Sequence, residues 1–178
     1  VLIRTRQAAD ALGATRCHRP EWVAVNERNR DVYVTFTNGT GNGSAVNSNR
    51  DPNPYGHIVR LHEAGADNTS LTFTWDIFVI AGDSSYDPTV PATQPAFGSP
   101  DGLWVDRDGR VWIQTDISNS SQNLASRGYD KIGNNQMLVG DPDTGEIRRF
   151  MTGPRGCEIT GITITPDQRT MFVNIQHP

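Results

Sequence analysis

A hairpin pattern that occurs three times is the feature that most constrains this chain. In its clearest copy, residues 101–116, two short runs rich in apolar residues flank Asp108-Gly109. Asp-Gly between such runs is a strong signal for a β-hairpin. Similar runs occupy 21–37 and 158–175, and each copy begins with an acidic residue just before or at its first strand. This repetition predicts an architecture built from one recurring unit.

Two further pairs of predicted strands complete the pattern. The first pair covers 56–63 and 71–80, and the second covers 136–140 and 146–152. Together with the hairpins they give four antiparallel strands per unit, which is typical of a β-propeller blade. A β-sandwich is the alternative, because it also uses many short strands. Repetition of an acid-led hairpin favours the propeller, since the strands of a sandwich have no reason to resemble one another.

We therefore predict an all-β fold, a partial β-propeller of about two and a half four-stranded blades that forms one domain over residues 1–178. The predicted blades span 21–80 and 101–152, followed by half a blade at 158–175. One short N-terminal helix is predicted at 4–12, since alanine and leucine favour helices and Gly13 favours a helix end. Two and a half blades cannot close a ring, so we expect a piece truncated from a longer protein.

Composition argues against several classes of protein. The chain has 16 basic and 20 acidic residues, a formal net charge of -4. Such a surface repels a phosphate backbone, so we expect no nucleic-acid partner. No apolar run reaches the ~18 residues that a membrane-spanning helix requires, so we expect no membrane partner. The two cysteines, Cys17 and Cys157, are interpreted as free thiols, and a bridge between them is the alternative.

The acidic residues that open the hairpins, Glu21, Asp101 and Glu158, are the candidate metal ligands. In a propeller the first strand of each blade lines the central channel, so residues at equivalent positions converge on the axis. Three convergent carboxylates suit a hard cation such as calcium. The alternative is that each acid only accepts hydrogen bonds from nearby turn amides.

Arg19 is the candidate phosphate ligand. It lies two residues before Glu21, so the two side chains point the same way on an extended chain. A guanidinium beside a carboxylate-bound cation is suited to phosphate, because its paired donors match phosphate oxygens. A plain ion pair between Arg19 and Glu21 is the alternative.

Several long blocks of sequence carry a family resemblance. They are HRPEWVAVNE, NPYGHIVRLHE, FTWDIFVIAGD, FGSPDGLWVDRDGRVWIQTD and the run from GNNQMLVGDPDTGEIRRF to the end. From about Ala8 to Pro178 the chain resembles the C-terminal part of the PhoX alkaline phosphatases. This resemblance implies a six-bladed propeller enzyme, exported by the twin-arginine route to the periplasm or beyond. It also implies hydrolysis of phosphate monoesters with calcium and iron.

The resemblance also assigns roles to individual residues. Arg19 would contact phosphate, whereas Glu21, Asp101 and Glu158 would be calcium ligands. Iron ligands are expected mainly in an N-terminal half that this chain lacks, and neither cysteine matches the family's iron-binding cysteine. We therefore predict a metal-dependent phosphatase that acts on small phosphate monoesters, with this piece inactive alone.

A non-catalytic propeller is the alternative function. It would use the long loops at 38–54 and 118–134 to bind a partner. On either interpretation the piece exposes blade faces that pack on neighbours in a closed ring. We predict self-association through these faces, because unpaired apolar sheet surfaces favour it.

Overall fold

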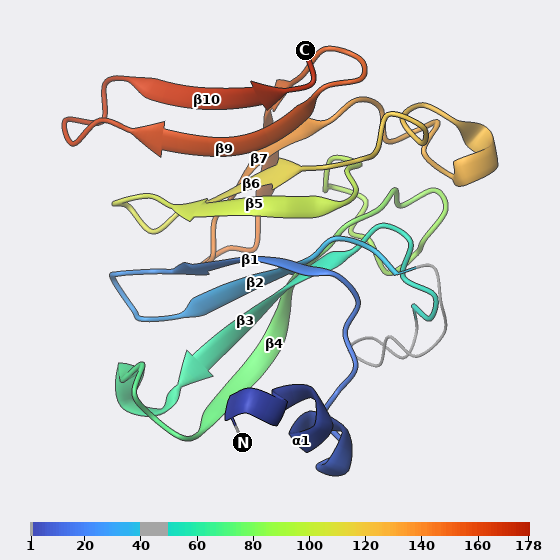
Figure 1. Cartoon of the computed structure of the whole chain (residues 1–178). Coiled ribbons are helices and arrows are strands. Elements are labelled where there is room, and N and C mark those ends of the chain that lie inside the picture. The colour runs from blue at the N-terminus through green and yellow to red at the C-terminus, as the bar shows by residue number, and fades with distance from the viewer. Residues whose placement is uncertain (1, 40–49) are drawn as a thin grey trace.

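The computed structural model describes residues 2–39 and 50–178 (Figure 1). In this part of the chain, one helix, α1 (Thr5–Ala11), precedes ten strands. The strands are β1 (Pro20–Val25), β2 (Val32–Phe36), β3 (His57–Glu63), β4 (Phe73–Ile80), β5 (Pro100–Val105), β6 (Val111–Thr115), β7 (Gln136–Gly140), β8 (Ile147–Thr152), β9 (Glu158–Ile164) and β10 (Met171–Gln176). Short 3₁₀ turns lie at Leu2–Arg4, Ala64–Ala66 and Ala125–Arg127.

The strands form three antiparallel sheets that stack face to face (Figure 1). The first sheet has the order β1-β2-β3-β4, the second has the order β5-β6-β7-β8, and the third pairs β9 with β10. The first strands of the three sheets, β1, β5 and β9, contact one another in that order and are termed the inner strands. This arrangement confirms the predicted all-β fold of repeated four-stranded sheets.

The helix at the N-terminus is also confirmed. It ends at Ala11, and Gly13 then takes a positive φ of 64°, a conformation that glycine adopts readily. No residue of α1 is buried, so the helix adds nothing to the core. In the described part of the chain, every helix is too short or too polar to cross a bilayer.

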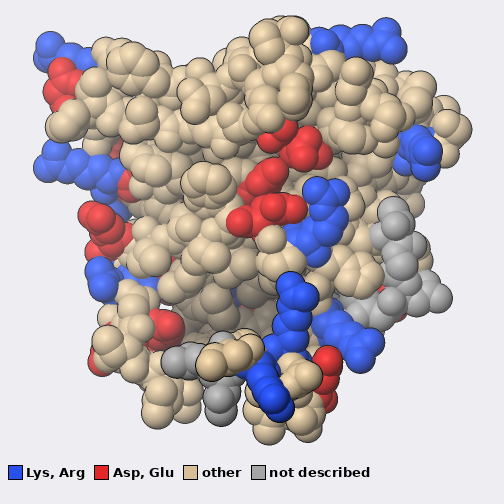
Figure 2. All heavy atoms as spheres, in the orientation of Figure 1, with Lys and Arg blue, Asp and Glu red and all other residues tan. Residues whose placement is uncertain are grey.

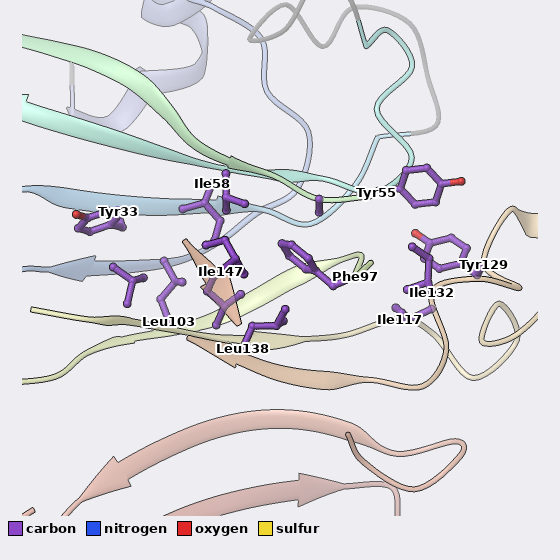
Figure 3. Packing of buried hydrophobic residues seen from close by; sticks show 14 residues of the cluster. Tyr33, Tyr55, Ile58, Phe97, Leu103, Ile117, Tyr129, Ile132, Leu138 and Ile147 are labelled. Atoms are coloured by element: carbon purple, nitrogen blue, oxygen red, sulfur yellow. The ribbon is translucent and has the colours of Figure 1, made fainter. Parts of the chain in front are cut away.

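The main core lies between the first and second sheets (Figure 3). Tyr33 and Ile58 of the first sheet pack with Leu103, Ile113 and Leu138 of the second. Successive residues of a strand point to opposite faces, so this core uses one side of each sheet. The other side of the second sheet packs on the third, which is why all of β6 is buried.

A smaller apolar cluster joins the second and third sheets. Trp112 and Met137 of the second sheet pack against Ile159 of the third, and Trp104 lies beside them. These two tryptophans therefore fill the space between sheets, as large aromatic side chains favour.

The first sheet has no sheet on its other side among the described residues. There, apolar side chains line a shallow groove that we term the outer face, and one of them, Trp75, is 48% exposed. The outer face consists of Val34, Phe36, Val59, Leu61, Phe73 and Trp75. Cys17 lines the same groove, whereas Cys157 is fully buried, and both thiols are free.

Candidate metal centre

A β-bulge interrupts each inner strand near its start. In β1 the two residues Glu21–Trp22 lie opposite Thr35 alone, and in β5 the two residues Asp101–Gly102 lie opposite Gln114. A bulge bends the strand and re-aims its side chains. Gly102 is required here, because a Cβ at that position would lie 2.8 Å from the carbonyl oxygen of Thr160.

The third sheet departs from the expected register. In β9 the bulge lies at Thr160–Gly161, opposite Asn174. Glu158 therefore stands two residues before the position that Glu21 and Asp101 occupy in their sheets. The expectation that the three acids hold equivalent positions is wrong for Glu158, because the sequence does not mark where the extra residue of a bulge falls.

Three carboxylates nevertheless meet at this end of the inner strands. An oxygen of Asp101, one of Asp116 and one of Glu158 all lie within 4.8 Å of one another. These three residues are termed the carboxylate cluster, and Figure 2 shows acidic side chains gathered on this face of the molecule beside basic ones. Of the three predicted metal ligands, the structure thus brings two together and adds one that the sequence reasoning missed.

The missed residue, Asp116, directly follows β6. Pairing of Pro100 with Thr115 places the end of β6 beside the start of β5, where Asp101 lies. The backbone N–H of Asp116 also donates to the carbonyl of Ser99 at 2.9 Å. In any two-stranded hairpin the last residues of the return strand lie beside the first residues of the opening strand. An acid at each end of one predicted hairpin was therefore a readable signal.

Crowding and burial raise the pKa of each member of the cluster. Burial first, and then the charges of Glu21 and Asp116, raise the pKa of Asp101 to about 6. Burial is also the largest cause of the raised pKa of Asp116 and of Glu158, and neighbouring acids raise both further. A bound cation would favour the ionised forms, since an opposite charge within a few ångströms lowers a carboxyl pKa.

Arg19 and Glu21 lie beside the cluster. Nη2 of Arg19 is 3.4 Å from Oε1 of Glu21, so the ion pair considered from the sequence is present. The Arg19 charge lowers the pKa values of Asp101 and Asp116, which places it within electrostatic reach of both. Glu21 acts on Asp101 through its charge but is not one of the three carboxylates that meet within 4.8 Å.

The backbone before two of the acids is unusual. Arg19 has a φ of 49°, and Ser99, its equivalent before β5, has a φ of 56°. Residues with a Cβ rarely adopt this region, and such conformations occur often at functional sites. The Arg19 carbonyl accepts a hydrogen bond of 3.1 Å from the N–H of Thr37, which helps to hold this conformation.

The chemistry of the cluster fits a hard divalent cation. Carboxylate oxygens are preferred ligands of calcium, which takes about 6–8 oxygens, so three carboxylates would supply part of its shell. A pocket beside the cluster is lined by Asn119, Arg155 and His177. The cluster contains no cysteine among the described residues, and iron stays a prediction from the resemblance.

The loop at 118–134 is anchored in the fold by three buried side chains, although most of its residues are exposed. Gln122, Tyr129 and Ile132 are buried, and the two apolar residues belong to the main core. These side chains are not offered to a partner. Of the other long loop, 38–54, residues 40–49 lie outside the described residues.

Four-stranded sheets stacked face to face, with carboxylates gathered at one end of their inner strands, define part of a β-propeller with a candidate metal centre. A comparison with protein families matches residues 1–178 to the family described as alkaline phosphatase PhoX. The chain therefore belongs to the PhoX family of alkaline phosphatases.

Solved structures agree with this assignment. The chain is similar to Pseudomonas fluorescens PhoX, described in complex with vanadate, a transition state analogue, with 46% identity and a TM-score of 0.87. The match covers 100% of this chain and 32% of that one, so the chain spans about a third of this relative's length. A gluconolactonase from Xanthomonas campestris, XC5397, matches with 16% identity and a TM-score of 0.38, over 92% of this chain and 56% of that one, and carries no weight. A comparison with curated proteins finds no match.

Proposed function

We propose that this chain forms part of the active site of a metal-dependent phosphatase that hydrolyses phosphate monoesters. Asp101, Asp116 and Glu158 bind calcium, and Arg19 binds the phosphate group of the substrate. Glu21 is assigned to hold Arg19 and to add negative charge beside the metal. The observation that carries this proposal is the meeting of three carboxylates within 4.8 Å, with an arginine in electrostatic reach, in a chain of the PhoX family.

The residues suit the roles assigned to them. Calcium bound at the cluster supplies positive charge that stabilises phosphate oxygens as negative charge develops on them. The Arg19 guanidinium is half-exposed, so its donors can reach a ligand in solvent while its ion pair with Glu21 restrains it. Its planar fork matches two phosphate oxygens at once. The vanadate complex of the P. fluorescens relative supports a phosphate ester as substrate.

Calcium titration calorimetry on the chelator-treated chain tests the metal site. We expect Ca²⁺ to bind, and we expect binding to be lost in Asp101→Asn. The matched control is Asp143→Asn, an exposed acid in the turn between β7 and β8, which should leave binding unchanged. Absence of Ca²⁺ binding in the wild-type chain, or equal loss in both variants, would contradict the site.

Hydrolysis of p-nitrophenyl phosphate tests the reaction, with full-length P. fluorescens PhoX as the positive control. The chain spans about a third of that protein, so we expect it to hydrolyse this substrate far more slowly, or not at all. Vanadate binding by the calcium-loaded chain should weaken in Arg19→Ala. A rate equal to that of the full-length relative would overturn the proposal that the piece is inactive alone. Export to the periplasm or beyond, as the resemblance implies, is part of the same proposal.

A further inference from the structure

Two buried side-chain amides join the segment that carries Asp116 to the segment that carries Glu158. They belong to Gln122 and Asn135, which are 1% and 0% exposed. Both amides donate to the carbonyl of Ile117, the residue after Asp116, over 3.0 and 2.9 Å. Both also donate to the carbonyl of Cys157, the residue before Glu158, over 3.1 and 2.9 Å. This pair is termed the amide clamp.

The clamp has little freedom to move. The Oδ1 atom of Asn135 accepts from the N–H of Ile117 at 2.6 Å and from the hydroxyl of Thr115 at 2.9 Å. Asn135 therefore uses both donors and both acceptor positions of its amide. The Oε1 atom of Gln122 accepts from the N–H of Gly156 at 3.0 Å. These bonds also fix which way each amide points, since a reversed amide would face carbonyls with an oxygen.

We propose that Gln122 and Asn135 are positioning residues for the metal centre: they set the separation of Asp116 and Glu158, and thereby the calcium affinity of the cluster. This inference rests on the proposed function. The two acids come from different sheets, and the structure joins their neighbouring carbonyls through these two amides. Metal affinity typically falls by about 10- to 100-fold when residues that orient the metal ligands through hydrogen bonds are replaced.

Calcium calorimetry on the full chain with Gln122→Met tests the clamp, because methionine keeps the length of the side chain and removes its hydrogen bonds. We expect the Kd for Ca²⁺ to rise by about 10- to 100-fold. The matched control is Gln136→Met. Gln136 is 1% exposed and donates to the carbonyls of Ala96 and Ile132 over 3.2 and 2.8 Å, neither of which adjoins an acid of the cluster. Its substitution should lower thermal stability to a similar degree but leave the Kd within about threefold of the wild-type value.

A second measurement needs no variant. If the clamp and the metal site are coupled, Ca²⁺ must also favour the clamped arrangement. Hydrogen exchange at the N–H groups of Ile117 and Gly156 should therefore slow when Ca²⁺ is added to the wild-type chain. Exchange at Ala81, whose N–H donates to the carbonyl of Gly56 beside the first sheet, should not change.

The outcomes separate the two proposals. A wild-type chain that binds no Ca²⁺ contradicts the proposed function, and the clamp inference fails with it. A wild-type chain that binds Ca²⁺, with an unchanged Kd in Gln122→Met or equal losses in Gln122→Met and Gln136→Met, overturns the clamp inference alone. Unchanged exchange at Ile117 and Gly156 during Ca²⁺ binding overturns it as well.

Discussion

β2 and β6 hold the same place in their sheets, yet their surroundings differ. All residues of β6 are buried, whereas those of β2 alternate between buried and partly exposed. β6 lies between two sheets, and β2 has the second sheet on one side and the outer face on the other. Even so, the partly exposed side of β2 consists of Val32, Val34 and Phe36, and such an apolar side suits a strand that is covered on both faces. The local sequence of a strand therefore indicates which of its faces can be buried, whereas the neighbouring sheets determine how much of each face is buried.

The largest expected effect compares Ile113 in β6 with its equivalent Val34 in β2. Ile113 is 0% exposed, so Ile113→Ala should lower the free energy of unfolding by about 3–4 kcal/mol through lost burial and a new cavity. Val34→Ala, on the partly exposed outer face, should cost about 1 kcal/mol or less. Urea denaturation of the two variants measures the difference. Equal losses would mean that the outer face is covered in solution, and light scattering would then test the predicted self-association.

The acids at the two bulges provide the next comparison. Asp101 belongs to the carboxylate cluster and Glu21 does not, although both occupy the same position in their sheets. Asp101→Asn should weaken Ca²⁺ binding by more than about 100-fold, since even outer partners of metal ligands are worth about 10- to 100-fold. Glu21→Gln should weaken it by less than about tenfold, because only a longer-range charge is lost. Calorimetry that ranks the two variants in the opposite order would move the metal toward β1.

A smaller effect concerns pH. In the metal-free chain the pKa of Asp101 is raised from 3.8 to about 6 by burial and by Glu21 and Asp116, with Arg19 opposing. A raised folded-state pKa adds stability below the unfolded value, and that stability is lost as the pH rises through about 6. The variant Asp101→Asn removes this dependence. The Tm of the variant minus the Tm of the wild type should be roughly 2–4 °C larger at pH 7 than at pH 4.5. This is the Tm shift for about 1 kcal/mol in a chain of this size.

This pH prediction has an internal control in the metal. The expected free-energy difference of about 1 kcal/mol is smaller than the full pKa shift of Asp101 would give, because Asp101 is partly exposed and solvent screens its charge. Added Ca²⁺ should raise the Tm of the wild-type chain at pH 7 by more than that of Asp101→Asn, since it binds the ionised wild-type site. The same Tm difference at both pH values would show that Asp101 is not held in a repulsive environment.

The two thiols give the smallest expected effect on the protein itself. Cys17 lines the groove of the outer face, whereas Cys157 is fully buried. Burial raises the pKa of both thiols, which lowers the fraction of reactive thiolate and slows the reaction of each cysteine with a thiol reagent. A thiol reagent should therefore modify Cys17 in the folded chain and reach Cys157 only through opening of the structure. Mass spectrometry of the modified peptides over time measures this order, and equal rates would contradict the contrast between the two regions.

Much of the fold could be predicted because the signals are local. The turn at Asp108-Gly109 and the alternation on either side of it fix a hairpin without reference to the rest of the chain. The helix prediction succeeded for the same reason, since Gly13 allows its end. How much of each sheet is covered depends on neighbouring sheets, which no local pattern contains.

The candidate site could be predicted only in part. Asp101 and Glu158 were found because each stands at the start of an inner strand. Asp116 was missed because it follows a return strand, and its proximity depends on the pairing of β5 with β6. Glu21 lies outside the cluster although it stands at the start of β1. Spacing along the sequence does not give the distances between side chains of different sheets, so this could not be predicted. The clamp could not be predicted, since Gln122 and Asn135 act through backbone carbonyls far away in sequence.

The bulges of the inner strands have a consequence for how such repeated units diverge. A one-residue slip in a regular strand would turn every following side chain to the opposite face. A bulge absorbs the extra residue, so the side chains at the start of an inner strand and the packing between sheets can change independently. The third sheet illustrates this freedom. Thr160 stands at the position that carries an acid in the other two sheets, and the acid of the third sheet is Glu158, two residues earlier, while Ile159 and Ile162 pack against the second sheet. A repeat of this kind can therefore gain, lose or relocate a ligand over evolutionary time without rebuilding its core.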